Sequence, residues 1–156
     1  MKEIKRILAP VDGSTPAKAA LEAAVDLAQH HGADLTILNV IDDFGAYTDA
    51  SDYTKLSDIL YDKNRIKLEE DEAYVKSLGF DRAEIKLLRG EAKDEIVSYA
   101  EANDIDLIVV GSTGKGSIRR ALLGSVSSYI VRHAHCDVLV VRWSGTFGIS
   151  ISSVRF

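Results

Sequence analysis

Residues 35–41 read Leu-Thr-Ile-Leu-Asn-Val-Ile, a short apolar run rich in β-branched side chains. A run that is continuous rather than alternating is typical of a strand covered on both faces, as in a parallel sheet. Similar runs occur at residues 7–9, 107–110 and 138–141, whereas residues 85–88 begin with an alternating pattern and are expected near a sheet edge. These runs predict five strands.

The segments between the runs have helical periodicity. In residues 16–31, small and apolar side chains recur at three- and four-residue spacing and form one stripe. Ser14 or Thr15 can cap the start of this helix, and Gly32 can supply the left-handed conformation that ends it. Further helical patterns cover residues 52–78, residues 91–102 and a segment that begins near Ser125.

Strands that alternate with helices predict an α/β fold with right-handed crossovers. We expect an open, doubly wound, parallel five-stranded sheet in the order 3-2-1-4-5, with helices on both faces. A closed eight-stranded barrel would need about 200 residues at least. Residues 1–142 form the predicted domain, and the Gly/Ser-rich tail at 143–156 stays unassigned, because it can either fray or add a strand at an interface.

Composition sets further limits. The 156 residues suit one domain, at roughly 150 residues per domain. Lys and Arg number 19 against 24 Asp and Glu, and the formal charge of −5 argues against a general binder of nucleic acid or anionic membranes. Cys136 is the only cysteine, which excludes an internal disulfide. The charged start does not resemble a signal peptide, and no apolar stretch approaches the roughly 18 residues of a membrane helix. We therefore expect a cytoplasmic protein.

The loop that follows residues 107–110 carries the strongest functional signal. In an open α/β sheet, ligands bind beyond the carboxyl ends of the strands, where the winding reverses. Gly111, Gly114 and Gly116 allow positive φ and leave N–H groups uncovered, as an anion-binding nest requires. Gly124-Ser125 then opens a helix whose first N–H groups can hold a phosphate. A plain strand-to-helix turn is the alternative.

Two known phosphate loops do not match this segment. A Walker-type loop fails because Val109 occupies the place of its first glycine and Gly116 follows Lys115. The dinucleotide fingerprint fails because Arg119 stands in the place of its last glycine.

The pattern Gly111-x-x-Gly114, nine residues, then Gly124-Ser125 resembles the ATP-binding signature of the universal stress protein family. Agreement extends over about residues 3–142. It includes the opening Ile7-Leu8-Ala9-Pro10-Val11-Asp12-Gly13-Ser14, Val40, Leu123-Gly124-Ser125-Val126-Ser127 and the closing Val138-Leu139-Val140-Val141-Arg142. One departure is Cys136-Asp137, where the family usually has proline before its last strand.

The resemblance implies a site for ATP, with Mg²⁺. Asp12 would hydrogen-bond the ribose hydroxyls or help hold a divalent ion near the phosphates, although an Asp beside Gly and Ser can also simply cap a turn. The remaining implied contacts are adenine with the backbone of Val40, the base with Pro10 and Val11, the ribose with Gly111, and the phosphates with Gly114, Gly124, Ser125 and Val126. Lys115, Arg119 and Arg120 can add positive charge.

The resemblance also implies a homodimer. The family pairs through its last strand, here Val138, Leu139, Val140 and Val141, which would otherwise leave an apolar strand edge exposed. The predicted function is that of an ATP-binding regulatory protein of the stress response. The alternatives are a slow ATPase or phosphotransferase, with Arg119 or Arg120 as an arginine finger, and an interaction module that needs no nucleotide.

The remaining reactive residues receive structural interpretations. His30, His31, His133 and His135 lie near expected helix ends, where the helix dipole favours them, and no metal site of their own is predicted. Cys136 is interpreted as a small residue at a strand entry. The carboxylates at residues 69–72 are expected on a solvated helix face. No catalytic triad is proposed.

Overall fold

The order of strands in the sheet follows the sequence-based expectation and extends it. The structure is a computed structural model that describes residues 2–42, 50–113, 123–143 and 149–154. Its strands are β1 (Arg6–Pro10), β2 (Asp34–Ile41), β3 (Ala83–Arg89), β4 (Leu107–Gly111), β5 (Asp137–Trp143) and β6 (Ile149–Val154). Its helices are α1 (Thr15–His31), α2 (Ala50–Ser77), α3 (Ala92–Ala102) and α4 (Ser125–His133).

The sheet has the order β3-β2-β1-β4-β5-β6. The first five of these strands are parallel, which confirms the doubly wound order 3-2-1-4-5. Within the tail that was left unassigned, β6 pairs antiparallel with β5 of the same chain, from Trp143 opposite Ile149 to Val138 opposite Val154. The tail thus adds a strand, but this strand joins the sheet of its own chain, whereas the expectation placed an added strand at an interface.

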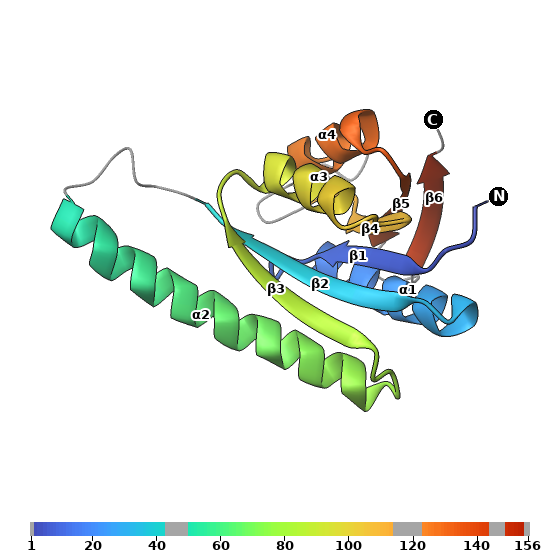
Figure 1. The fold of residues 1–156 in the computed structure, drawn as a ribbon, viewed down its shortest axis with the longest axis horizontal. Helices are drawn as coiled ribbons and strands as arrows, with labels where there is room; N and C mark the ends of the chain where they lie inside the picture. Colours follow the sequence, from blue (N-terminus) through green and yellow to red (C-terminus); the bar gives the residue numbers. More distant parts are fainter. Residues whose placement is uncertain (1, 43–49, 114–122, 144–148, 155–156) are drawn as a thin grey trace.

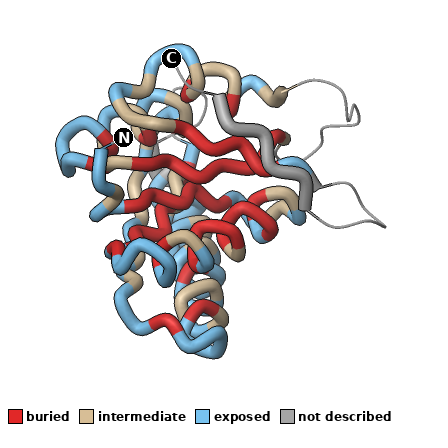
Figure 2. The backbone as a smooth tube through the Cα atoms, turned by 90° about the vertical axis from the view of Figure 1, so that its right-hand side faces the viewer, coloured by how far each residue is buried: buried red, intermediate tan, exposed pale blue. Residues whose placement is uncertain are grey.

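The helices form one layer on each face of the sheet (Figure 1). One apolar cluster joins the sheet to α1 and α2 through residues such as Leu21, Val25 and Leu68. The other joins it to α3 and α4 through Ile96 and Ile130. Figure 2 shows the central strands as continuous buried segments between these layers. Burial on both faces explains why the strand sequences are continuous apolar runs.

Helix α1 is delimited at both ends by the expected signals. Ser14, not Thr15, is the N-cap, and its Oγ accepts a hydrogen bond from the N–H of Ala17 at 3.3 Å. Gly32 ends the helix with φ 65°, in the left-handed region. These signals place the N-terminus of α1 directly after the exit of β1.

Helix α2 has 28 residues and ends at Ser77, before Gly79, which has φ 87°. Leu68 and Val75 bury one side of its second half against β2 and β3. Its first half projects past the carboxyl ends of the strands (Figure 1). The helix therefore forms a wall beside the edge of the sheet where ligands bind in folds of this class.

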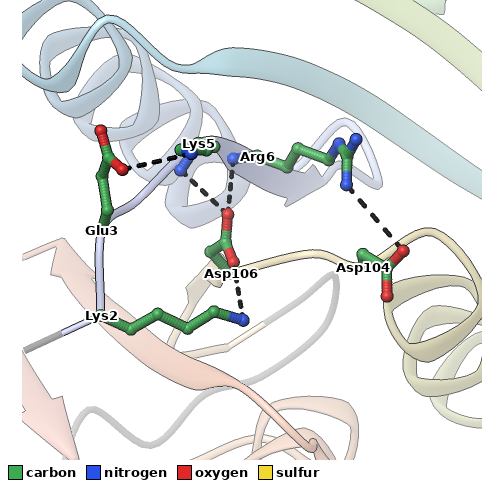
Figure 3. Close-up of polar contacts among 6 residues, drawn as sticks. All are labelled: Lys2, Glu3, Lys5, Arg6, Asp104 and Asp106. Atoms are coloured by element: carbon green, nitrogen blue, oxygen red, sulfur yellow. Dashed lines mark hydrogen bonds and ion pairs between the residues drawn. The ribbon is translucent and has the colours of Figure 1, made fainter.

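Asp106 fixes the start of β1 beside the start of β4 (Figure 3). Its Oδ2 accepts hydrogen bonds from the N–H groups of Lys5 at 2.9 Å and Arg6 at 3.0 Å, and its Oδ1 lies 3.3 Å from the Lys2 ammonium. Burial raises the pKa of this carboxyl group, but the contacts with Lys5, Arg6 and Lys2 lower it more, so the pKa lies below its usual value. This contact aligns the amino ends of β1 and β4, so the carboxyl ends of both strands lie at the same edge of the sheet.

Candidate functional site

A cavity of about 620 Å³ lies at the carboxyl edge of the sheet, where β1 and β4 separate. Its walls come from the exits of β1, β2 and β4, the start of α4, one side of α3 and the projecting part of α2. The apolar side chains of its lining include Leu38, Val40, Leu60, Ile96 and Val110. The polar residues of its lining include Asp12, Asn39, Asn64, Thr113, Ser125 and Ser127. The volume and the mixed lining suit a small molecule that has both an apolar and a polar part.

The exit of β1 is held in place by β2. The N–H of Val11 donates to the carbonyl of Leu38 at 2.8 Å, and the Asn39 side-chain amide donates to the carbonyl of Val11 at 2.7 Å. Asp12 follows at the exposed mouth of the cavity, where its Oδ1 accepts from the N–H of Ser14 at 2.9 Å. The turn-capping alternative for Asp12 is therefore realised in the structure. It leaves the carboxylate on the cavity wall.

Gly111, the last residue of β4, is required by packing. A Cβ built on it would lie 2.8 Å from the Pro16 carbonyl carbon and 3.0 Å from the Ala17 nitrogen, both backbone atoms of α1. Among the described residues, the glycines with positive φ are Gly13, Gly32, Gly79 and Gly90. The expectation of positive φ is therefore wrong for Gly111, which instead lets the first turn of α1 approach the sheet.

The start of α4 is tied to the exit of β4 through one acceptor. The carbonyl of Ser112 receives the Gly124 N–H at 2.7 Å and the buried Ser127 hydroxyl at 2.9 Å. The first backbone bond of the helix runs from the Ser128 N–H to the Gly124 carbonyl at 2.9 Å. The Gly124 amide is thus used within the chain, while the N–H groups of the first turn, at Ser125 and Val126, have no acceptor inside the helix.

The structure brings together nearly all of the predicted binding residues. Those that line the cavity are Pro10, Val11, Asp12, Val40, Gly111, Gly124, Ser125 and Val126. Gly114 lies outside the described residues, as do Gly116, Lys115, Arg119 and Arg120, so their expected roles stay predictions. Among the described residues of the lining, the charged ones are Asp12 and Asp42, and both are acidic.

Sequence reasoning missed the contribution of α2 and α3. Leu60 and Asn64 reach the cavity from α2, and Ala92 and Ile96 reach it from α3. The helical periodicity indicates that Leu60 and Ile96 face inward, but it gives no sign that the first half of α2 extends past the sheet. Asn39 was also missed. The only signal for it is a polar amide inside an apolar strand run.

A smaller cavity of about 220 Å³ adjoins the first and shares Val11, Asp12, Asn39 and Asn64 with it. Its far wall carries Asp71, which the sequence placed on a solvated face with its acidic neighbours. Asp71 is instead half-buried, and burial, with a smaller contribution from Glu70, raises the pKa of its carboxyl group. The expectation of a solvated face is wrong for this residue.

The histidines and the cysteine lie where the sequence placed them. His30, His31 and His133 occupy the last turns of α1 and α4. In the described parts of the chain, no group of three His, Cys, Asp or Glu residues is arranged to hold a metal ion. Cys136 packs against the cluster under α3 and α4, and burial, with a smaller contribution from Asp137, raises its pKa to about 11. The thiol is therefore protonated at neutral pH and a poor nucleophile.

Comparison with known proteins identifies the family of this chain and solved structures with a similar fold. The family model described as the universal stress protein family matches residues 3–142. The chain belongs to this family. A universal stress protein of Methanocaldococcus jannaschii is 32% identical over 140 residues, which cover 88% of this chain and 82% of the relative. The solved structure of a universal stress protein from Lactobacillus plantarum is 36% identical, with a TM-score of 0.81 over 90% of this chain and 99% of that one.

A further solved member of the universal stress protein family was crystallised in complex with cAMP. It is 28% identical to this chain, covers 90% of it and 98% of its own length, and has a TM-score of 0.71. Nucleotide binding is thus a property found within the family. Among the helices that the structure describes, none combines the length and apolar character needed to cross a bilayer.

Proposed function

We propose that this universal stress protein binds ATP, together with Mg²⁺, in the cavity between β1 and β4 and acts as a nucleotide-dependent regulator in the cytoplasm. The observation that carries the proposal is one cavity of about 620 Å³ whose lining combines apolar side chains, polar side chains and the N-terminus of α4. The family's cAMP complex supports a nucleotide as the ligand.

The apolar residues of the lining suit a purine base. Leu38, Val40 and Val110 come from the sheet, and Leu60 and Ile96 come from helices on the two opposite faces. Flat aromatic rings gain most from burial between such surfaces. Val40 is the penultimate residue of β2, and its backbone groups supply the polar edge that a base needs for orientation. Pro10 and Val11 complete this wall at the exit of β1.

The polar residues of the lining suit the ribose and phosphates. Asp12 offers a carboxylate to hydroxyl groups, or to a divalent ion that the phosphates bring with them. The first-turn amides of α4, at Ser125 and Val126, and the Ser125 hydroxyl face a phosphate group as donors, and the helix dipole adds to the attraction. Because the charged residues of the described lining are both acidic, a nucleotide whose phosphates are neutralised by Mg²⁺ fits better than the bare anion.

Isothermal titration with ATP, in the presence and absence of Mg²⁺, tests the proposal. We expect saturable binding with Mg²⁺, and an Asp12→Asn variant that keeps the acceptor for the Ser14 N–H but binds MgATP about tenfold more weakly, because it loses its charge. Nucleotide released from the denatured protein provides an independent check. No measurable binding at millimolar MgATP would remove the proposal.

The homodimer expected through Val138–Val141 stays a prediction. The structure adds one requirement for it, which concerns β6. Within this chain, the outer side of β5 is paired with β6 from Val138 to Trp143. A second copy can add to β5 only if β6 leaves that edge. The strand edge on which the expectation rested is therefore not open in the structure.

A further inference from the structure

The edge of the sheet formed by β3 is open, and its sequence is complementary to itself. β3 is the terminal strand of the sheet, and its seven residues, Ala83–Arg89, pair with β2 in one unbroken register from Leu35 to Ile41. Such edges are commonly protected by charged side chains, proline, a bulge or a covering segment. The β3 sequence has no proline and its register has no bulge, and no described strand pairs with its outer side. Its central charges, Glu84 and Lys86, are of opposite sign.

Two hydrogen bonds between β2 and the ends of β3 establish which backbone groups of β3 face outward. The Arg82 carbonyl accepts from the Leu35 N–H at 3.1 Å, and the Gly90 N–H donates to the Ile41 carbonyl at 3.0 Å. Because the N–H and C=O groups of successive strand residues point to opposite sides, the even-numbered residues between them bond to β2. The backbone N–H and C=O groups of Ala83, Ile85 and Leu87 therefore point away from β2, at the outer edge of the sheet, and can pair with another strand.

A second β3 can pair antiparallel around Ile85. With the two-fold axis at this residue, Ile85 faces its own copy and Ala83 faces Leu87, and both are hydrogen-bonded pairs, as the outward direction of these residues requires. The half-buried side chains of Ala83, Ile85 and Leu87 belong to the cluster under α1 and α2. In this pairing a small residue lies opposite a large one, and each gains burial.

The same register places opposite charges directly across from each other. Glu84 faces Lys86 of the second copy and Lys86 faces its Glu84, both in non-hydrogen-bonded positions, where side chains approach most closely. Both side chains are exposed, and in the described part of the chain neither takes part in an ion pair. Glu84 accepts a hydrogen bond from the Thr36 hydroxyl at 3.3 Å, which holds its carboxylate at the sheet.

The neighbouring registers are unfavourable. Centred on Glu84, the pairing would place Glu84 opposite itself and Arg82 opposite Lys86. Centred on Lys86, it would place Lys86 opposite itself and Glu84 opposite Leu88. Like charges directly opposite each other destabilise a strand pair. The charge pattern therefore selects the Ile85 register.

We propose that β3 is an interface through which two copies of this chain associate, with their sheets joined antiparallel about Ile85. The interface lies at the end of the sheet opposite β5 and β6, and it does not depend on nucleotide binding.

Charge reversal tests the interface by sedimentation equilibrium or by light scattering after size exclusion. Glu84→Lys and Lys86→Glu each convert both opposite-charge pairs into like-charge pairs, so we expect the dissociation constant to rise by about tenfold or more in each variant. The double variant E84K/K86E restores both pairs and the dimer. An equimolar mixture of the two single variants also restores them, as a heterodimer. Glu101→Lys, an equal charge change on the exposed side of α3, is the matched control and stays dimeric.

Cross-linking tests the register in a Cys136→Ala background. When Glu84→Cys and Lys86→Cys chains are mixed and oxidised, we expect a disulfide between the two kinds of chain. Directly opposed residues at non-hydrogen-bonded positions are close enough for a disulfide to form. Neither variant cross-links to itself. A wild-type chain that is monomeric at millimolar concentration, a molar mass that is the same in both charge-reversal variants as in the wild type, or self-cross-linking of either cysteine variant would overturn the proposal. Since Lys86 has no role in the cavity, MgATP binding is unchanged in K86E, and this result separates the interface from the proposed function.

Discussion

Gly111 and Gly124 both line the cavity, but of the two only Gly111 is required by the packing of the fold. A Cβ at Gly111 would meet backbone atoms of α1 at 2.8–3.0 Å, which side chains cannot relieve. A Cβ at Gly124 would make ordinary contacts, the nearest at 3.4 Å to the Thr113 Cα. Gly124 also has φ −64°, which any residue adopts. The fold therefore does not require glycine at position 124.

This contrast predicts opposite effects for one added methyl group. We expect Gly111→Ala to lower the free energy of unfolding by about 1–3 kcal/mol, because the first turn of α1 must move away from β4. Gly124→Ala should leave the unfolding midpoint nearly unchanged and weaken MgATP binding several-fold, because the methyl group narrows the space beside the α4 amides. Thermal denaturation and titration of both variants check this. Equal loss of stability in the two variants would contradict it.

At the scale of residues, the role of a residue could be predicted from the sequence where local backbone preferences determine that role. Ser14 and Gly32 could be placed because caps and left-handed glycines have strong local preferences. The packing role of Gly111 and the burial of Asp71 could not be predicted. Each depends on which segment packs beside it, and this is settled by tertiary contacts that leave no local pattern.

Asp106 acts at the scale of elements, because it joins the first residues of β1 to β4. Its side chain is only 10% exposed and bonds two backbone N–H groups of the neighbouring strand. Asp104, in contrast, lies 3.9 Å from Arg6 and is 86% exposed, and such surface pairs contribute little. The two carboxylates lie close in sequence but differ in burial.

Asp106→Asn is therefore expected to lower the free energy of unfolding by about 1–2 kcal/mol at neutral pH, and Asp104→Asn to have little effect. The pKa of Asp106 is lower in the folded protein than in the unfolded chain, so its stabilisation is present above the unfolded pKa. That contribution is lost as the pH falls through the folded pKa. The stability difference between wild type and D106N should shrink accordingly in acid, as measured by urea denaturation at several pH values. A difference that does not change with pH would contradict this.

The elements themselves were largely predictable. Continuous apolar runs marked the buried strands, and the alternation at residues 85–88 correctly marked β3 as an edge strand. The reach of α2 beyond the sheet was not predictable, because periodicity gives a face and a length but no position along the neighbouring strands. The pairing of β6 was left open for a similar reason. Loose alternation fits both a frayed tail and an edge strand.

For the whole molecule, the two ends of the sheet differ in how they are covered. One end is β3, whose outer side pairs with no described strand, and the other is β6, which occupies the edge of β5 that the family resemblance assigned to a second copy. The sequence alone could not show which end of the sheet pairs within the chain and which can pair with a second copy. A strand edge that pairs within the chain and one that pairs between chains satisfy the same hydrogen-bonding groups.

Removal of residues 144–156 should therefore change how the whole chain assembles. In the K86E background, where the β3 interface is disfavoured, the full-length chain is expected to be monomeric because β6 covers β5. The shortened chain exposes the outer backbone groups of Val138–Trp143 and should associate through β5, with a molar mass by light scattering that approaches twice the monomer value as concentration rises. Circular dichroism must show that the shortened chain keeps its α/β content. A shortened chain that remains folded and monomeric would show that the edge of β5 does not pair with itself, and the last-strand homodimer would then fall with it.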